Sequence, residues 1–61
     1  MFTISRVDEF GCDEFVSVAP NSIEMLSNKL YAAKFHTVIE AETVMNFFKR
    51  ENVIPQDCEV K

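Results

Sequence analysis

The stretch from residue 21 to 34 constrains the fold more than any other, because its apolar residues recur at helical spacing. These residues are Ile23, Leu26, Leu30 and Ala33. They fall on one stripe of a helix with 3.6 residues per turn. Asn21 and Glu24 match a capping box, in which the two side chains accept hydrogen bonds from free backbone N–H groups of the first turn. The pattern predicts a first helix over residues 21–34.

Residues 1–19, ahead of this helix, predict a β-hairpin. Two runs of alternating apolar and polar residues have the period of half-buried strands. The polar segment between them ends at Gly11, the only glycine of the chain, which can adopt the positive φ that a tight reversal needs. In such a hairpin Val7 and Phe15 would lie on the sheet face away from the helix, where a monomer exposes them.

Two interpretations fit residues 35–39, which are rich in β-branched and aromatic residues. The first is a short strand that precedes a second helix over residues 41–51. In the second, Thr37 caps a longer helix and Glu40 completes the capping box. We favour the strand, because β-branched residues are poor in the first turn of a helix.

The second helix has an apolar stripe and clear end signals. The stripe consists of Ala41, Val44, Met45 and Phe48. We expect Asn52 to be the left-handed residue that ends the helix, with Val53 folding back onto Phe48. Pro55 forbids further helix, and residues 55–61 are expected to form a polar tail.

Together these elements predict one domain over residues 1–61 of the α+β class. Its expected architecture is a two-layer ββαβα unit, a hairpin, a helix, a short strand and a helix, with both helices on one face of the sheet. The alternative, without the short strand, is ββαα.

Composition excludes several classes of protein. The chain has 61 residues, six of them Phe, and a net charge of −4. This charge argues against direct binding of nucleic acid, which requires clustered Lys and Arg. No run approaches the roughly 20 apolar residues of a membrane span, and the N-terminus does not resemble a signal peptide. We expect a cytoplasmic protein with no membrane association.

The residues that could carry chemistry are scattered. Cys12, His36 and Cys58 stand singly, whereas a zinc site requires four ligands with paired short spacings. The thiols match no redox motif, so we expect them to be free and dispensable. No glycine-rich phosphate loop or nucleophile motif occurs. The sequence therefore predicts no cofactor, no metal and no enzymatic activity, and a thiol- or metal-dependent activity is the alternative hypothesis.

Two groups of residues are candidates for binding a partner. The first is a cluster of carboxylates around the predicted hairpin turn, formed by Asp8, Glu9, Asp13 and Glu14. It is interpreted either as a solvated turn, which the residue types favour, or as a surface that steers docking onto a basic protein. The second group is apolar and contains Val7, Phe15, Tyr31 and Phe47. A small domain has too little core to hide all of these side chains, and exposed aromatic clusters mark interfaces.

The leading hypothesis for function is a small, acidic, non-enzymatic module that binds a protein with a basic surface. Such a module would act as an inhibitor or modulator of a larger protein, in the manner of proteins that phages and other mobile elements direct against host factors. We also expect a homodimer, because 61 residues bury only a small core. The alternative is a homo-oligomeric structural module with no external target.

Overall fold

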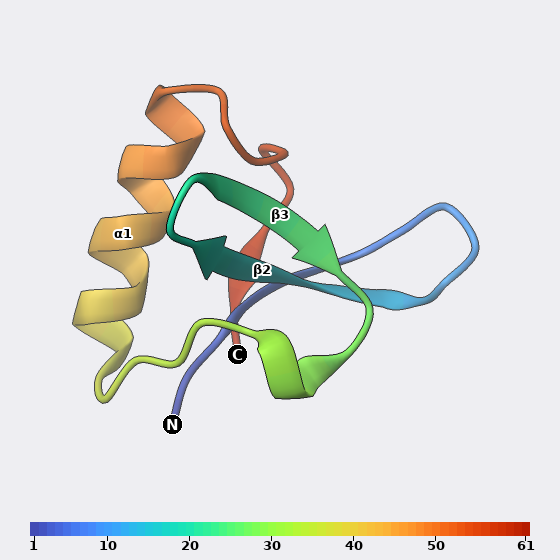
Figure 1. Cartoon of the computed structure of the whole chain (residues 1–61), viewed down its shortest axis with the longest axis horizontal. Coiled ribbons are helices and arrows are strands. Elements are labelled where there is room, and N and C mark those ends of the chain that lie inside the picture. Colours follow the sequence, from blue (N-terminus) through green and yellow to red (C-terminus); the bar gives the residue numbers. More distant parts are fainter.

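The computed structural model describes residues 1–61 and shows a small α+β fold, which confirms the predicted class. Its strands are β1 (Ile4–Val7), β2 (Asp13–Ala19), β3 (Ser22–Leu26) and β4 (Glu59–Val60). They form one antiparallel sheet in the order β3-β2-β1-β4. The single α-helix, α1 (Val38–Arg50), lies on one side of this sheet, and a 3₁₀ turn, η1 (Lys29–Tyr31), connects β3 toward it (Figure 1). The order of elements is therefore neither ββαβα nor ββαα.

The predicted hairpin is present. β1 pairs with β2 so that Ser5 faces Phe15 and Val7 faces Asp13. Gly11 adopts a φ of +81° in the turn, as its freedom from a side chain allows. The turn extends from the sheet on the side away from α1 (Figure 1).

The prediction of a helix over residues 21–34 is wrong. Pro20 and Asn21 form a two-residue turn, and the chain returns beside β2 as β3, with Ala19 opposite Ser22. Asn28 then caps η1 by accepting a hydrogen bond from the N–H of Leu30. Leu30, which a helix would have placed on the inner stripe, is exposed.

Two physical features explain this correction. Ile23 and Met25 stand two residues apart, which is the period of a strand, and both pack against the core from β3. Asn and Ser, which occur here at residues 21, 22, 27 and 28, favour turns over helix interiors because their side chains can hydrogen-bond to the nearby backbone, as that of Asn28 does. Pairing with β2 then supplies the backbone hydrogen bonds that the helix would have made.

The predicted strand over residues 35–39 is reduced to a single bridge. Phe35 pairs with Phe2 through two backbone hydrogen bonds of 2.8 Å, and α1 begins three residues later. The alternative with Thr37 as the cap is confirmed, because its hydroxyl accepts from the N–H of Glu40 at 3.1 Å. The Glu40 carboxylate reaches back to the N–H of His36. This capping network outweighs the poor fit of two β-branched residues in the first turn.

The end signals of the helix are confirmed. Asn52 has a φ of 59°, and its N–H donates to the carbonyl of Lys49. The N–H of Val53 donates to the carbonyl of Phe48, which completes a Schellman motif. Helix α1 therefore runs from residue 38 to 50 rather than 41 to 51.

The prediction of a polar tail over residues 55–61 is wrong as well. Cys58 is buried, and β4 pairs with β1 so that Val60 faces Ile4. The N–H of Lys61 donates to the carbonyl of Thr3. Only Cys58 and Val60 alternate here, which is too short a run for periodicity to reveal a strand.

The core is small and lies between the sheet and α1. Its buried centre consists of Ile4, Val16, Ile54 and Cys58. Around them pack Ile23, Met25, Phe35, Val44, Met45 and Phe48. The apolar stripe predicted for the second helix therefore does face the core, since Ala41 is also buried. The C-terminal segment supplies half of the buried centre.

Replacing Thr37 by Ala should lower the free energy of unfolding by about 1 kcal/mol, because the N–H of Glu40 loses its capping acceptor. Thr43→Ala is the matched control. Thr43 lies on the exposed side of the same helix and donates to the carbonyl of Ile39, so its loss should be neutral or slightly stabilising. Urea unfolding followed by circular dichroism measures both. Equal effects of the two substitutions would contradict the role of Thr37.

Cys58→Ser should destabilise the protein by about 1–3 kcal/mol, because it places a hydroxyl in the apolar core. Cys12→Ser, in the exposed turn, should change the free energy of unfolding by less than about 0.5 kcal/mol. Thermal unfolding of the two variants tests the contrast. The burial of Cys58 therefore revises the expectation that both thiols are dispensable.

Candidate functional site

Asp8 organises the end of the β1–β2 hairpin, residues 7–13, which we call the hairpin tip. Its Oδ1 atom accepts from the N–H groups of Phe10 and Cys12, both at 2.9 Å. Its own N–H donates to the carbonyl of Cys12, and its carbonyl accepts from the N–H of Gly11. Four hydrogen bonds thus converge on one residue and fix the backbone of the turn.

Phe10 is held outward by this turn. Its side chain is 83% exposed, more than any other large apolar side chain of the chain. Val7 and Cys12 beside it are also exposed. The hairpin tip contains three carboxylates, those of Asp8, Glu9 and Asp13, and no Lys or Arg. The hairpin tip therefore combines one exposed aromatic side chain with a net negative charge.

Arg6 secures the base of the hairpin. Its guanidinium lies 2.7 Å from Glu14 on β2 and 2.9 Å from Asp57, which precedes β4. A second nitrogen donates to Asp57 at 3.2 Å, so the contact with Asp57 is bidentate. These hydrogen bonds from Arg6 hold the pKa of the Asp57 carboxyl below its ordinary value. These contacts of Arg6 with Glu14 and Asp57, which we call the Arg6 clamp, join the hairpin to the C-terminal segment.

The eight residues predicted to bind a partner do not form one site. Val7, Asp8, Glu9 and Asp13 come together at the hairpin tip. Glu14 is paired with Arg6, and Phe15 is half-buried within β2. Tyr31 lies exposed in η1, and Phe47 lies on α1 beneath the guanidinium of Arg50, 5.5 Å from its ring centre. The hairpin turn projects on the side opposite α1 (Figure 1).

Sequence reasoning missed Phe10, although a signal was present. Phe10 directly precedes the glycine of the predicted turn, and a turn at the end of a hairpin has no second layer to cover an aromatic ring. An aromatic residue at that position is therefore expected to be exposed.

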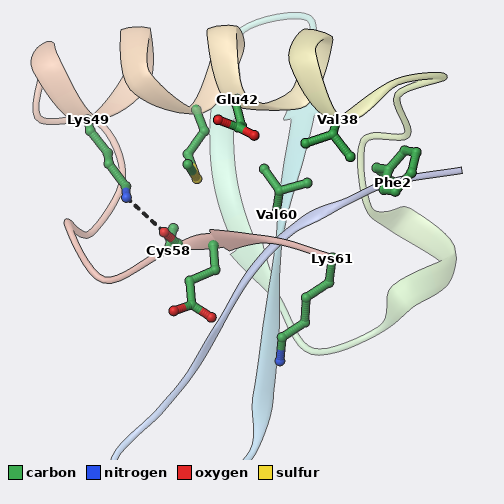
Figure 2. A pocket seen from close by; sticks show the side chains of 9 residues that line it. Phe2, Val38, Glu42, Lys49, Cys58, Val60 and Lys61 are labelled. Carbon is green, nitrogen blue, oxygen red and sulfur yellow. Dashed lines mark hydrogen bonds between the residues drawn. The ribbon is translucent and has the colours of Figure 1, made fainter.

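A shallow hollow of about 470 Å³ lies between α1, β4 and the N-terminal segment, and Figure 2 shows the side chains that line it. The ammonium of Lys49 donates to the carbonyl of Cys58 at 2.7 Å, so it is engaged with the backbone. Burial raises the pKa of the Cys58 thiol, which disfavours the nucleophilic thiolate. The hollow therefore holds no activated nucleophile.

Other chemistry receives no support from the geometry. No group of three or more His, Cys, Asp or Glu side chains lies close enough to hold a metal ion. His36, the only histidine, is exposed next to the start of α1. The one α-helix is too short and too polar to span a bilayer.

Comparison with known proteins gives no relative. The chain matches no protein-family model, no curated protein and no solved structure.

Asp57→Asn should remove stability that is present at neutral pH and absent in acid. Because the folded pKa of Asp57 is depressed, its contribution is complete above the unfolded value of about 3.9 and is lost as the pH falls through the folded value. The difference in free energy of unfolding between the wild type and this variant should therefore shrink as the pH is lowered from neutral through the folded pKa of Asp57. Urea titrations across this range measure it.

Asp13→Asn is the control, because Asp13 is exposed and forms no ion pair in the chain. It should leave the acid dependence of stability unchanged. An equal loss in both variants would show that the Arg6 clamp does not couple Asp57 to folding.

Proposed function

We propose that this protein is a non-enzymatic binding module that docks its hairpin tip onto a basic surface of a larger protein. The observation that carries the proposal is Phe10, which is 83% exposed on a turn fixed by four hydrogen bonds of Asp8. Docking of this kind inhibits or modulates the larger protein when the covered surface is a functional one.

The exposed ring is suited to act as an anchor. A large apolar side chain gains free energy when a partner's pocket removes it from water, and a few such aromatic residues carry most of the binding energy of an interface. The turn hydrogen bonds also lower the cost of binding, because the backbone around Phe10 is already ordered before contact. The geometry therefore favours insertion of the Phe10 side chain into a pocket of the partner over burial of a broad surface.

The surrounding carboxylates select the charge of the partner. Glu9 and Asp13 are exposed, and neither forms an ion pair within the chain. Their field attracts a basic surface at long range and raises the association rate at low salt. Two tips of the same charge would repel each other, so contact through this surface favours a different protein over a second copy of this chain.

Phe10→Ser should weaken binding at least about tenfold, mainly through faster dissociation, because it removes the proposed anchor. The double change Glu9→Gln and Asp13→Asn should instead slow association and flatten its salt dependence. The partner is first captured from cells that express the protein and identified by mass spectrometry. Binding of the purified partner to each variant is then measured by biolayer interferometry at several salt concentrations.

Leu30→Ser is the matched control, because Leu30 is 81% exposed but lies at η1, outside the hairpin tip. It should bind as the wild type does. A partner that binds the Phe10 variant and the charge variant as tightly as the control would show that the tip is only a solvated turn.

A further inference from the structure

The outer edge of β3 carries backbone groups that have no partner in the chain. β3 is an edge strand of five residues, whereas β4 at the other edge has only two. The carbonyl of Val16 accepts from the N–H of Ala33, on the β1 side of β2. The backbone groups of Val16 therefore point away from β3, and Val16 and Met25 form one of the pairs that exchange no hydrogen bonds. In such a pair Met25 directs its own N–H and carbonyl away from β2, toward the open edge.

The same alternation applies to Ile23. Ser22 and Ala19 close a two-residue turn as a hydrogen-bonded pair, so the next pair, Ile23 with Val18, is not hydrogen-bonded. None of the hydrogen bonds formed elsewhere in the chain uses the backbone of Ile23 or Met25. The edge therefore offers two donors and two acceptors at strand spacing, which is what an added antiparallel strand requires.

We propose that β3 accepts an extended segment of another protein as a fifth strand, with a Lys or Arg of that segment opposite Glu24. This inference goes beyond the hairpin tip and concerns a second surface. Glu24 is exposed on the sheet face that Ile23 and Met25 do not use, and no Lys or Arg of the chain pairs with it. Its only side-chain hydrogen bond is a long one of 3.5 Å from Ser22.

The position of Glu24 also discriminates against self-pairing. Two copies of β3 pair most fully when Ile23 of one faces Met25 of the other, and this register places Glu24 opposite Glu24. Residues opposite each other at this non-hydrogen-bonded position are close, so the two carboxylates repel, whereas a cation is attracted. Charged residues on edge strands commonly prevent self-association in this way.

Apolar side chains should flank the cation of the added segment. A residue opposite Ile23 points to the same face as Ile23, which lines a hollow with Val18, Phe48 and Val53. The segment that fits is therefore an extended apolar–basic–apolar sequence. The backbone groups of its two apolar residues would form the hydrogen bonds with β3. Its basic side chain would lie next to that of Glu24, on the sheet face that Ile23 and Met25 do not use.

The test is an NMR titration of the ¹⁵N-labelled protein with the acetylated peptide amide Thr-Val-Lys-Val-Thr. The largest amide shifts should fall on Ile23 and Met25, whose hydrogen exchange should slow. The peptide with Glu in place of Lys should bind about three- to tenfold more weakly. In Glu24→Lys the preference between the two peptides should reverse.

Backbone pairing is tested separately with methylated peptides. Methylation of the backbone nitrogens of the two Val residues should abolish binding, because these N–H groups face β3. Methylation of the backbone nitrogen of Lys should not, because that N–H group points away from β3. Phe10→Ser should leave peptide binding unchanged, which keeps this result separate from that of the hairpin tip. Absence of binding, shifts centred on another element, or indifference to Val methylation would each overturn the proposal.

Discussion

Burial of Ile4 and Val16 between the sheet and α1 is the constraint on which the rest of the structure depends. Both side chains are fully buried on neighbouring central strands. A sheet of four short strands cannot hide them alone, so Ile54 and Cys58 from the C-terminal segment and one face of α1 must cover them. Because each element contributes only a few buried side chains, none can be removed without exposing the others. A chain of this size should therefore unfold as one unit.

The parts of the fold that were predictable are those with local signals. The turn at Gly11, the N-cap at Thr37 and the Schellman end at Asn52 each depend on a few adjacent residues, and each is present. Of the segments that were predicted wrongly, residues 59–60 were decided by long-range pairing, whereas residues 22–26 pair with their neighbour β2 across a two-residue turn. Residues 22–26 became a strand because β2 lies beside them, and residues 59–60 did so because β1 does. Residues 22–26 do carry the strand period at Ile23 and Met25, although the helical stripe of residues 21–34 was given more weight, whereas residues 59–60 are too few to show a period.

The candidate site shows the same division. The acidic hairpin turn was predictable because charge and turn residues are local. The Arg6 clamp was predictable only in part, because Arg6 and Glu14 face each other across β1 and β2, whereas Asp57 lies 51 positions from Arg6 in the sequence. Tyr31 and Phe47 are exposed, as a small core implies, but they lie on η1 and α1 and not at the hairpin tip. The exposure of Phe10 follows from the turn alone, so it could have been predicted from the sequence.

The Arg6 clamp links the small core to the proposed function. The core ends near Ile4, and the hairpin extends beyond it without a covering layer, so its rigidity must come from polar contacts. Arg6 joins β1, β2 and the segment before β4 at the base of the hairpin, and Asp8 fixes the turn at its end. Local hydrogen bonds can therefore keep the hairpin rigid where it extends beyond the hydrophobic core. The hairpin tip can therefore vary in sequence at Phe10, Glu9 and Asp13 without disturbing the core, which is the property expected of a surface that recognises another protein.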